Sequence, residues 1–160
     1  MNPIQAQCRI DTPLGAMTLA ATAHGLAGAW FDGQKHHPGP LAAPVDPRHP
    51  HLQRAAAAFA AYFRGEAVTL ELDPQGTPFQ QSVWQALRTI APGRTTSYGE
   101  IAARIGRPAA VRAVGAAVGR NPISVIVHCH RVVGRDGAIT GYAGGLDRKQ
   151  RLLALEAKAA

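Results

Sequence analysis

The segment Asp73-Pro-Gln-Gly76 divides the chain into two halves with different residue patterns. Proline and glycine interrupt regular structure. Here they separate a first half of short, alternating apolar and polar runs from a second half in which apolar residues recur at helical spacing. A chain of 160 residues can hold two small domains. We therefore predict an α+β protein with an N-terminal domain over residues 1–75 and a C-terminal domain over residues 76–160.

In the first half, turn signals separate short runs that alternate apolar and polar residues, which is typical of a small antiparallel sheet. The predicted strands cover residues 17–21, 26–31 and 68–72. An alanine-rich run over residues 52–64 predicts a helix that Gly65 ends. Residues 33–50 are rich in proline and histidine and predict a surface loop. Because the spacing of the histidines matches no structured zinc motif, we expect no metal there.

The second half carries capping signals that predict a mainly helical domain. Thr77-Pro78 predicts the start of one helix, and Ser97-Tyr-Gly-Glu100 fits the capping box of another. Gly106-Arg-Pro108 ends that helix, and residues 109–119 predict the next. Two short helices joined by a glycine-containing turn are typical of a helix-turn-helix. A last helix is expected to begin with Asp147 as its cap and to run to Glu156.

The net charge of +7 is distributed unevenly along the chain. Residues 77–160 hold 12 basic and four acidic side chains, whereas residues 1–76 are close to neutral. A basic half would attract a polyanion such as DNA or RNA, although a basic face that only maintains solubility is the alternative.

The predicted second helix of the helix-turn-helix, residues 109–119, consists mostly of alanine, glycine and valine. It has almost no side chain that could read base edges in a major groove. Small residues allow a close backbone approach, and the single Arg112 could enter the base stack, as in proteins that bind and distort any DNA sequence. The alternative is a small-residue helix packed in a core. The charge asymmetry favours DNA.

The apolar run Ile123-Ser-Val-Ile-Val127 predicts a buried strand that ends close to Cys129, with His130 and Arg131 beside it. A screened thiol next to a potential proton acceptor can act as a nucleophile. The alternative is a cysteine that packs as a small apolar residue. A reactive thiol beside a DNA-binding surface implies chemistry on a base, and that base must first rotate out of the duplex.

Five motifs resemble those of the O6-alkylguanine-DNA alkyltransferases, the methylated-DNA–protein-cysteine S-methyltransferases, in their order and spacing. They are Ser97-Tyr98-Gly99, Arg112-Ala-Val-Gly115, Asn121-Pro122, Cys129-His130-Arg131-Val132 and Gly141-Tyr142-Ala-Gly-Gly145. The resemblance covers roughly residues 77–157. It implies a ribonuclease-H-like N-terminal α/β domain with a small antiparallel sheet, and a C-terminal domain with a winged-helix-like helix-turn-helix.

The resemblance also implies the reaction. Cys129 would accept an alkyl group irreversibly from O6-alkylguanine in double-stranded DNA, and from O4-alkylthymine. His130 would act as the base through a water molecule, and Glu156 would orient His130. This water, which the resemblance implies, fits the sequence, because adjacent residues of an extended segment point to opposite sides. One protein molecule would be consumed for each lesion.

Other residues take roles from the same resemblance. Tyr98 would help to rotate the nucleotide and donate a proton to the departing guanine, Arg112 would replace the rotated base, and Asn121 would brace the active-site segment. The further residues expected to contact DNA are Ala110, Ala113 and Gly115. Those expected to form the guanine pocket are Val127, Tyr142 and Gly144.

The chain departs from the family at two positions. Family members usually carry proline where this chain has His128, and commonly a second proline where it has Ser124. Because proline restricts the backbone, both changes should loosen the segment that carries Cys129. We predict that transfer is retained at a reduced rate.

Three alternative functions differ in what they require. A lesion-binding protein without transfer would follow if His128 disables the thiol, a helix-turn-helix regulator would need a defined operator, and a thiol hydrolase would turn over small esters. The sequence predicts no cofactor, and no zinc because Cys8 is alone in its half. It shows no secretory pattern and no apolar run long enough to span a membrane, and two distant cysteines suit a reducing cytoplasm. We expect a monomer that could bind DNA cooperatively.

Overall fold

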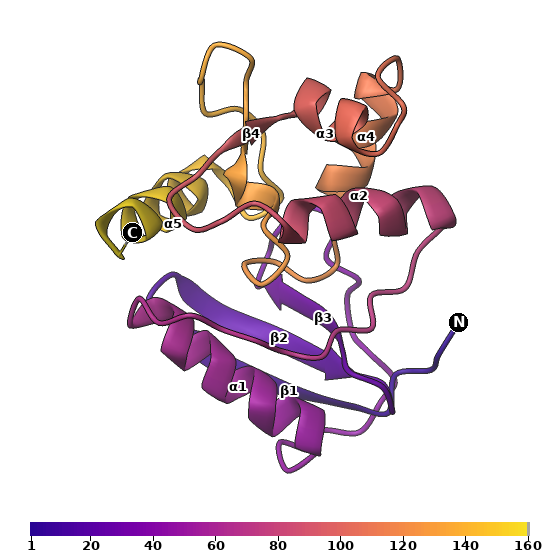
Figure 1. Ribbon diagram of the computed structural model, residues 1–160. Helices are drawn as coiled ribbons and strands as arrows, with labels where there is room; N and C mark the ends of the chain where they lie inside the picture. The colour runs from indigo at the N-terminus through magenta and orange to yellow at the C-terminus, as the bar shows by residue number, and fades with distance from the viewer. Residues whose placement is uncertain (160) are drawn as a thin grey trace. The chain divides into compact units, whose positions relative to one another are not determined.

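The computed structural model describes residues 1–159, and the chain forms two compact units, Met1–Gln75 and Gly76–Ala160. Figure 1 shows a strand-rich first unit and a second unit that is mainly helical. In the described part of the chain, no helix combines the length and the apolar character needed to cross a membrane.

The first unit is an antiparallel meander with one helix packed on it (Figure 1). Its elements are β1 (Ala6–Thr12), β2 (Gly15–Ala21), β3 (Leu26–Phe31) and α1 (Pro50–Phe63). The strands pair in the order β1-β2-β3. The core between sheet and helix contains Met17, Leu19, Phe31, Leu52 and Phe59, each no more than 1% exposed. The strands predicted over residues 17–21 and 26–31 and the predicted helix are confirmed, β1 pairs beside them, and Gly65 follows the helix with φ of 82°.

The strand predicted over residues 68–72 is wrong. Only Leu72 pairs, in a single bridge to Leu26, flanked by hydrogen bonds from Leu26 N to Glu71 O at 3.0 Å and from Asp73 N to Leu26 O at 2.7 Å. None of residues 68–72 is buried. Their alternation therefore has no apolar face to place against a core, and burial of such a face is what normally fixes the register of a strand.

Over its described residues 76–159, the second unit contains five helical segments and a two-stranded parallel sheet. Its elements are α2 (Pro78–Arg88), β4 (Thr96–Ser97), α3 (Tyr98–Arg104), α4 (Val111–Gly119), the 3-10 turn η1 (Cys129–Arg131), β5 (Val132–Val133) and α5 (Leu146–Ala159). Helices α2, α3 and α4 pack on one another, and α5 packs against η1. The helix-turn-helix expected from the sequence corresponds to α3 and α4.

The capping signals located most helix starts. Thr77 forms a reciprocal capping box with Gln80 at the start of α2. Ser97 accepts a hydrogen bond from Glu100 N at 3.1 Å, but the Glu100 carboxylate accepts from Thr96 Oγ1, so the expected box forms only in part. Helix α4 begins at Val111, two residues later than expected. In α5, Asp147 lies in the first turn, one residue after the helix begins. Its Oδ2 atom lies 4.0 Å from Arg151 Nε.

The strand predicted over residues 123–127 is also wrong, because the segment forms a tight turn. Ile126 N donates to Ser124 O at 2.9 Å, and Val127 N donates to Ile123 O at 3.1 Å. Val125 has φ of 75°, a conformation that a β-branched residue rarely adopts. The predicted burial is correct, since Ile123, Val125 and Val127 are 0% exposed. A short apolar run indicates burial but does not distinguish a strand from a buried turn.

Candidate active site

Cys129 is the first residue of η1 and is 6% exposed. Its backbone N–H donates to Val127 O at 2.8 Å, and Asn121 Nδ2 donates to Cys129 Sγ at 3.1 Å. The Asn121 amide also contacts Ile123 N, Ile123 O and Val127 O at 2.9 to 3.2 Å. A single buried side chain therefore holds both ends of the turn and the sulfur atom.

Burial raises the pKa of the Cys129 thiol to about 11. The hydrogen bond from Asn121, the positive charge of Lys149 and nearby backbone N–H groups act in the opposite direction. The thiol is therefore protonated at neutral pH. Because the thiolate is the nucleophile, the proton must be removed as the sulfur reacts.

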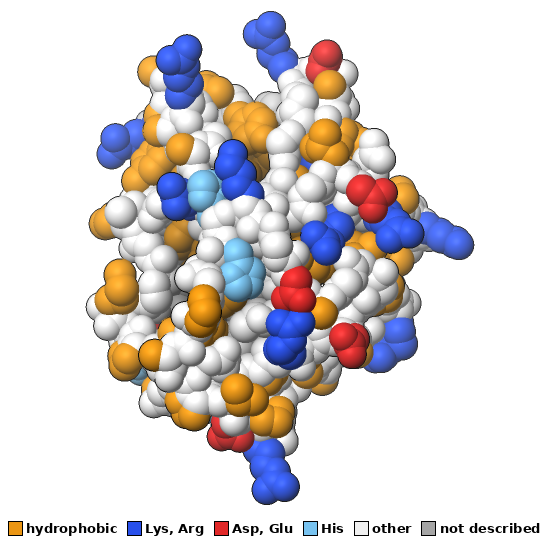
Figure 2. Space-filling model, turned by 180° about the vertical axis from the view of Figure 1, so that it is seen from behind, with side chains coloured by type: hydrophobic (Ala, Val, Ile, Leu, Met, Phe, Trp, Pro, Cys, Tyr) orange, Lys and Arg blue, Asp and Glu red, His pale blue; other side chains and the backbone are white. Residues whose placement is uncertain are grey.

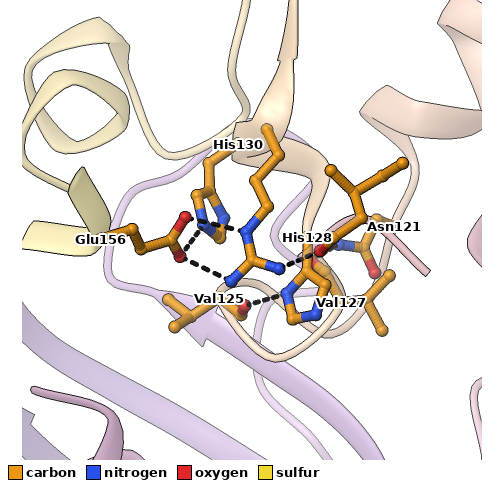
Figure 3. Close-up of polar contacts among 8 residues, drawn as sticks. Asn121, Val125, Val127, His128, His130 and Glu156 are labelled. Atoms are coloured by element: carbon orange, nitrogen blue, oxygen red, sulfur yellow. Dashed lines mark hydrogen bonds and ion pairs between the residues drawn. The ribbon is translucent and has the colours of Figure 1, made fainter. Parts of the chain in front are cut away.

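His130, Glu156 and Arg131 form a buried network (Figure 3). His130 Nε2 lies 2.6 Å from Glu156 Oε2. Arg131 donates from Nε to Glu156 Oε1 at 2.8 Å and from Nη2 to Oε2 at 2.9 Å, and its Nη1 bonds to Ile90 O. Glu156 is only 3% exposed. Glu156 is therefore not a solvated carboxylate at the end of a helix.

The tautomer of His130 follows from this network. Since the carboxylate of Glu156 accepts, Nε2 carries the proton and Nδ1 has the lone pair. Nδ1 is buried and has no hydrogen-bond partner within residues 1–159. Burial lowers the pKa of His130 although Glu156 raises it, so the ring is neutral at pH 7. His130 thus presents a neutral nitrogen base one residue from the thiol.

An extended segment cannot account for a water between Cys129 and His130. The two residues lie in a 3-10 turn and not in an extended segment, so the alternation of strand side chains does not apply. What supports a bridged proton transfer is the buried, unpartnered Nδ1 atom itself.

Lys149 is a buried residue of the site that the sequence reasoning missed. It is 0% exposed, and its Nζ donates to the carbonyls of Val132, Thr140 and Gly141. Burial lowers the pKa of Lys149, while its charge lowers the pKa of the Cys129 thiol. The sequence did contain a signal, because Lys149, Leu152 and Glu156 lie on one face of α5.

Tyr98 and Tyr142 each have a partner near the candidate site, Thr140 and His130 respectively. Tyr98, the first residue of α3, is half-buried and bonds to the Thr140 side chain. Burial raises the pKa of the Tyr98 hydroxyl. Tyr142 stands edge-on to His130 with ring centroids 6.4 Å apart. Val127 and Gly144 are both buried.

Helix α4 has one buried apolar face and one accessible face of small residues. Val114, Ala117 and Val118 are buried, and Trp84 Nε1 donates to Ala117 O at 2.8 Å. Arg112 and Ala113 are exposed, while Ala110 and Gly115 are half-buried. Core packing therefore accounts for one side of the helix only, and the side that carries Arg112 remains accessible.

Most basic side chains of the second unit are exposed. Figure 2 shows Lys and Arg side chains projecting separately over the face it presents, with acidic side chains scattered among them. The exposed members within residues 77–159 are Arg88, Arg94, Arg104, Arg107, Arg112, Arg120, Arg135, Arg151 and Lys158. Arg131 and Lys149, by contrast, hold the active-site region together from inside.

Over residues 1–159, no three His, Cys, Asp or Glu side chains are grouped so that they could hold a metal ion. Cys8 and Cys129 are both free and buried. In the first unit, His51 Nε2 contacts the Ala23 carbonyl and His49 Nε2 contacts the Gln5 side chain, so both rings have structural partners.

Two family models match the chain in succession. One, described as "6-O-methylguanine DNA methyltransferase, ribonuclease-like domain", matches residues 9–74. The other, described as "6-O-methylguanine DNA methyltransferase, DNA binding domain", matches residues 78–158. Together they cover both units.

Relatives of known name are similar over almost their whole length. The methylated-DNA–protein-cysteine methyltransferase of Mycolicibacterium paratuberculosis is 48% identical over 149 residues, which cover 92% of this chain and 89% of the relative. A protein of the same name from Methanosarcina barkeri is 47% identical over 152 residues, which cover 92% and 94%.

Solved structures agree with the sequence relatives. A crystal structure of Mycobacterium tuberculosis OGT in complex with DNA superposes with a TM-score of 0.86 at 45% identity and covers 97% of this chain and 94% of that one. A structure of the O6-methylguanine methyltransferase from the same organism gives a TM-score of 0.87 at 46% identity, covering 99% and 95%. This chain therefore belongs to the 6-O-methylguanine DNA methyltransferase family.

Proposed function

We propose that the protein repairs DNA by direct reversal of alkylation, moving the alkyl group of O6-alkylguanine irreversibly to Cys129. The observation that carries the proposal is a buried thiol beside a neutral histidine whose Nδ1 is unpartnered and whose Nε2 bonds to Glu156. The identity to named methyltransferases over both units supports the same reaction.

The reaction is a displacement at the alkyl carbon. The thiol proton passes through a water molecule to His130 Nδ1, and Glu156 stabilises the resulting imidazolium. A bond forms between Cys129 Sγ and the alkyl carbon while the carbon–O6 bond breaks, and its electron pair remains on guanine. Tyr98 donates a proton towards the guanine. Because the product thioether is stable, each molecule acts once.

Asn121 and Lys149 position the nucleophile and favour its anionic form. Asn121 directs an amide N–H at the sulfur, and Lys149 contributes a positive charge from α5. Both effects become stronger as the thiol becomes a thiolate, which is when they assist the reaction.

DNA binding belongs to the α3–α4 pair in this proposal. Arg112 takes the place of the rotated base, and the small residues Ala110, Ala113 and Gly115 let the backbone of α4 approach the DNA. Val127, Tyr142 and Gly144 form the pocket for the base. Residues 1–75 then serve as an N-terminal α/β domain, and residues 76–160 as the DNA-binding and alkyl-acceptor domain.

Some finer features belong to the same proposal. They are acceptance of O4-alkylthymine, a monomeric protein that could bind DNA cooperatively, and residence in the cytoplasm. The two free cysteines suit a reducing compartment.

The test is stoichiometric transfer from a duplex that contains one O6-methylguanine. Mass spectrometry of the tryptic peptide covering residues 121–131 should show one added methyl group, and the DNA should regain guanine. A duplex with ordinary guanine and a Cys129→Ser variant are the controls, and the peptide that carries Cys8 should remain unmodified. If the lesion duplex binds tightly and the peptide stays unchanged, the protein senses the lesion without repairing it.

A further inference from the structure

The side chain of His128 closes the turn that precedes the acceptor cysteine. His128 Nδ1 lies 3.2 Å from the carbonyl oxygen of Val125, and Figure 3 shows the ring turned back towards that residue. Because a carbonyl can only accept, Nδ1 carries the proton and donates. The bond spans three residues and ends one residue before Cys129.

The carbonyl that His128 holds belongs to a residue in an unfavourable conformation. Val125 has φ of 75°, although β-branched side chains strongly disfavour positive φ. Such a conformation persists only where surrounding contacts enforce it. Asn121 holds Ile123 and Val127 on either side of Val125, and His128 holds Val125 itself.

The backbone of His128 leads directly into the cysteine turn. Its carbonyl accepts from Arg131 N at 3.0 Å, and this bond belongs to the turn that carries Cys129. The φ of His128 is −81°, near the range that a proline ring imposes. Hydrogen bonds therefore restrain both the side chain and the backbone of His128.

We propose that His128 is a positioning residue: its Nδ1–H bond to the Val125 carbonyl fixes the turn over residues 125–128 and so directs the Cys129 sulfur. This inference rests on the alkyl transfer proposed above. It replaces the expectation that the chain is looser at this position for lack of a proline, because a side-chain hydrogen bond supplies the restraint that a ring would supply.

A second base is the competing role for His128, and the geometry opposes it. Its Nδ1 is already used as a donor to a carbonyl. The rings of His128 and His130 meet edge-on with centroids 6.1 Å apart, and no hydrogen bond joins the two side chains. Burial, together with the charges of Arg131 and His130, lowers the pKa of His128 to about 3. The ring therefore keeps one protonation state throughout the neutral range.

Four substitutions test the hydrogen bond. His128→Ala removes the donor, and His128→Gln moves the amide one bond further along the side chain. His128→Asn places an amide nitrogen at the same distance from the backbone as Nδ1, and His128→Pro restrains φ without any donor. His24→Ala removes an exposed histidine of the first unit and serves as the matched control.

The readout is the single-turnover rate of methyl transfer to Cys129, measured with saturating O6-methylguanine duplex. We expect His128→Ala and His128→Gln to react about five- to tenfold more slowly, the loss that one hydrogen bond accounts for. His128→Asn and His128→Pro should stay within about threefold of the parent, since each restores a restraint. Thermal unfolding of every variant shows whether a slow rate reflects loss of the fold.

The outcomes separate this inference from the function on which it rests. A parent protein that takes up no methyl group contradicts the proposed function. A parent that reacts, together with an alanine variant that is folded and equally fast, contradicts the role of His128 alone. If the ratio of the parent rate to the alanine-variant rate changes between pH 6 and 9, His128 acts through titration, and the positioning role is wrong. Equal slowing in the alanine and asparagine variants would also overturn it.

Discussion

At the scale of single residues, the site depends on charges and protons held away from water. Cys129, His130, Arg131, Lys149 and Glu156 are all nearly or fully buried. Buried charged groups need partners. Glu156 pairs with Arg131 and accepts a hydrogen bond from the His130 N–H, and three backbone carbonyls accept hydrogen bonds from Lys149. The thiol itself carries no charge until it reacts.

The protonation of Cys129 predicts how stability depends on pH. Its pKa is raised from 9.0 to about 11 in the folded protein. The folded state therefore holds the proton more tightly than the unfolded state, and this contribution to stability is complete below pH 9 and is lost as the pH rises towards 11. Between pH 9 and 11 the parent should lose about 2 kcal/mol more unfolding free energy than Cys129→Ala. Denaturant titrations at each pH measure the difference.

Cys8 provides the control for this measurement. Its pKa is also raised by burial, but the thiol lies in β1 and far along the chain from the active-site turn. Cys8→Ala should keep the alkaline loss that belongs to Cys129. Parallel pH curves for the parent and Cys129→Ala would show that the buried thiol does not titrate above its ordinary range.

The residues of the candidate site could be predicted from the sequence to different degrees. Cys129 and His130 could be chosen from their own neighbourhood, because a thiol after an apolar run and beside a histidine is a local pattern. Glu156 required the family resemblance, since it lies 26 residues from His130 along the chain. Lys149 was missed because lysine side chains are rarely buried, although this one shares a face of α5 with Leu152 and Glu156.

At the scale of elements, α4 combines a buried face that supports the fold with an accessible face proposed to meet DNA. Gly115 is half-buried and lies between these two faces. A Cβ atom added there would meet the Tyr98 ring at 3.8 Å, an ordinary contact. Alanine is therefore compatible with the protein's own packing at this position.

Substitution of Gly115 by alanine should separate stability from DNA binding. In a helix interior, alanine is more favourable than glycine by roughly 0.5–1 kcal/mol, so the melting temperature of Gly115→Ala should rise. The added methyl group should weaken binding to duplex DNA, measured by fluorescence anisotropy, because it holds the helix backbone away from the phosphates. Gly119→Ala is the matched control, since nothing lies within 4 Å of its Cβ and it ends the helix. Equal DNA affinity in both variants would argue against close approach at Gly115.

The helices and the strands over residues 17–21 and 26–31 were predicted well, whereas the segments over residues 68–72 and 123–127 were not. Helix α2 begins at the expected residue because the Thr77 cap and Pro78 act locally, and the alanine-rich run predicts α1 close to its actual start at Pro50. The 123–127 turn was predicted as a strand because buried apolar residues occur in both structures. Its actual path depends on the Asn121 amide and on His128, two side chains that bond across the turn.

At the scale of the whole molecule, the positive charge is concentrated in the half that contains the proposed DNA site. Exposed arginines occur in α2, α3 and α4 and in the connecting segments. Along the chain they therefore lie within the helix-turn-helix and next to it. Arg131 and Lys149 contribute to the net charge but are committed to internal partners. The exposed charges are therefore the ones available to phosphates.

The salt dependence of DNA binding should report these exposed charges. Each phosphate that a basic side chain neutralises contributes about 0.9 to the slope of log affinity against log salt on duplex DNA. Three or more contacts predict a slope steeper than about −2.7 on an unmodified duplex. Arg112→Ala should leave this slope nearly unchanged and reduce lesion repair, because its proposed place is in the base stack, whereas Arg107→Ala should reduce the slope if that exposed side chain meets a phosphate. A salt-independent affinity would contradict a phosphate-based interface.

By itself the sequence predicted two halves of different pattern, the strands over residues 17–21 and 26–31 and the positions of most helices, and it proposed Cys129 as the nucleophile with His130 as its base. These features depend on spacing, capping and composition, which act over a few residues. Only the tertiary structure decided that Lys149 is buried close enough to lower the thiol pKa and that residues 123–127 turn instead of extending. It also brings Glu156 to His130, a contact that the family resemblance had implied. Those outcomes depend on long-range burial and on hydrogen bonds across the fold, and no local pattern carries that information.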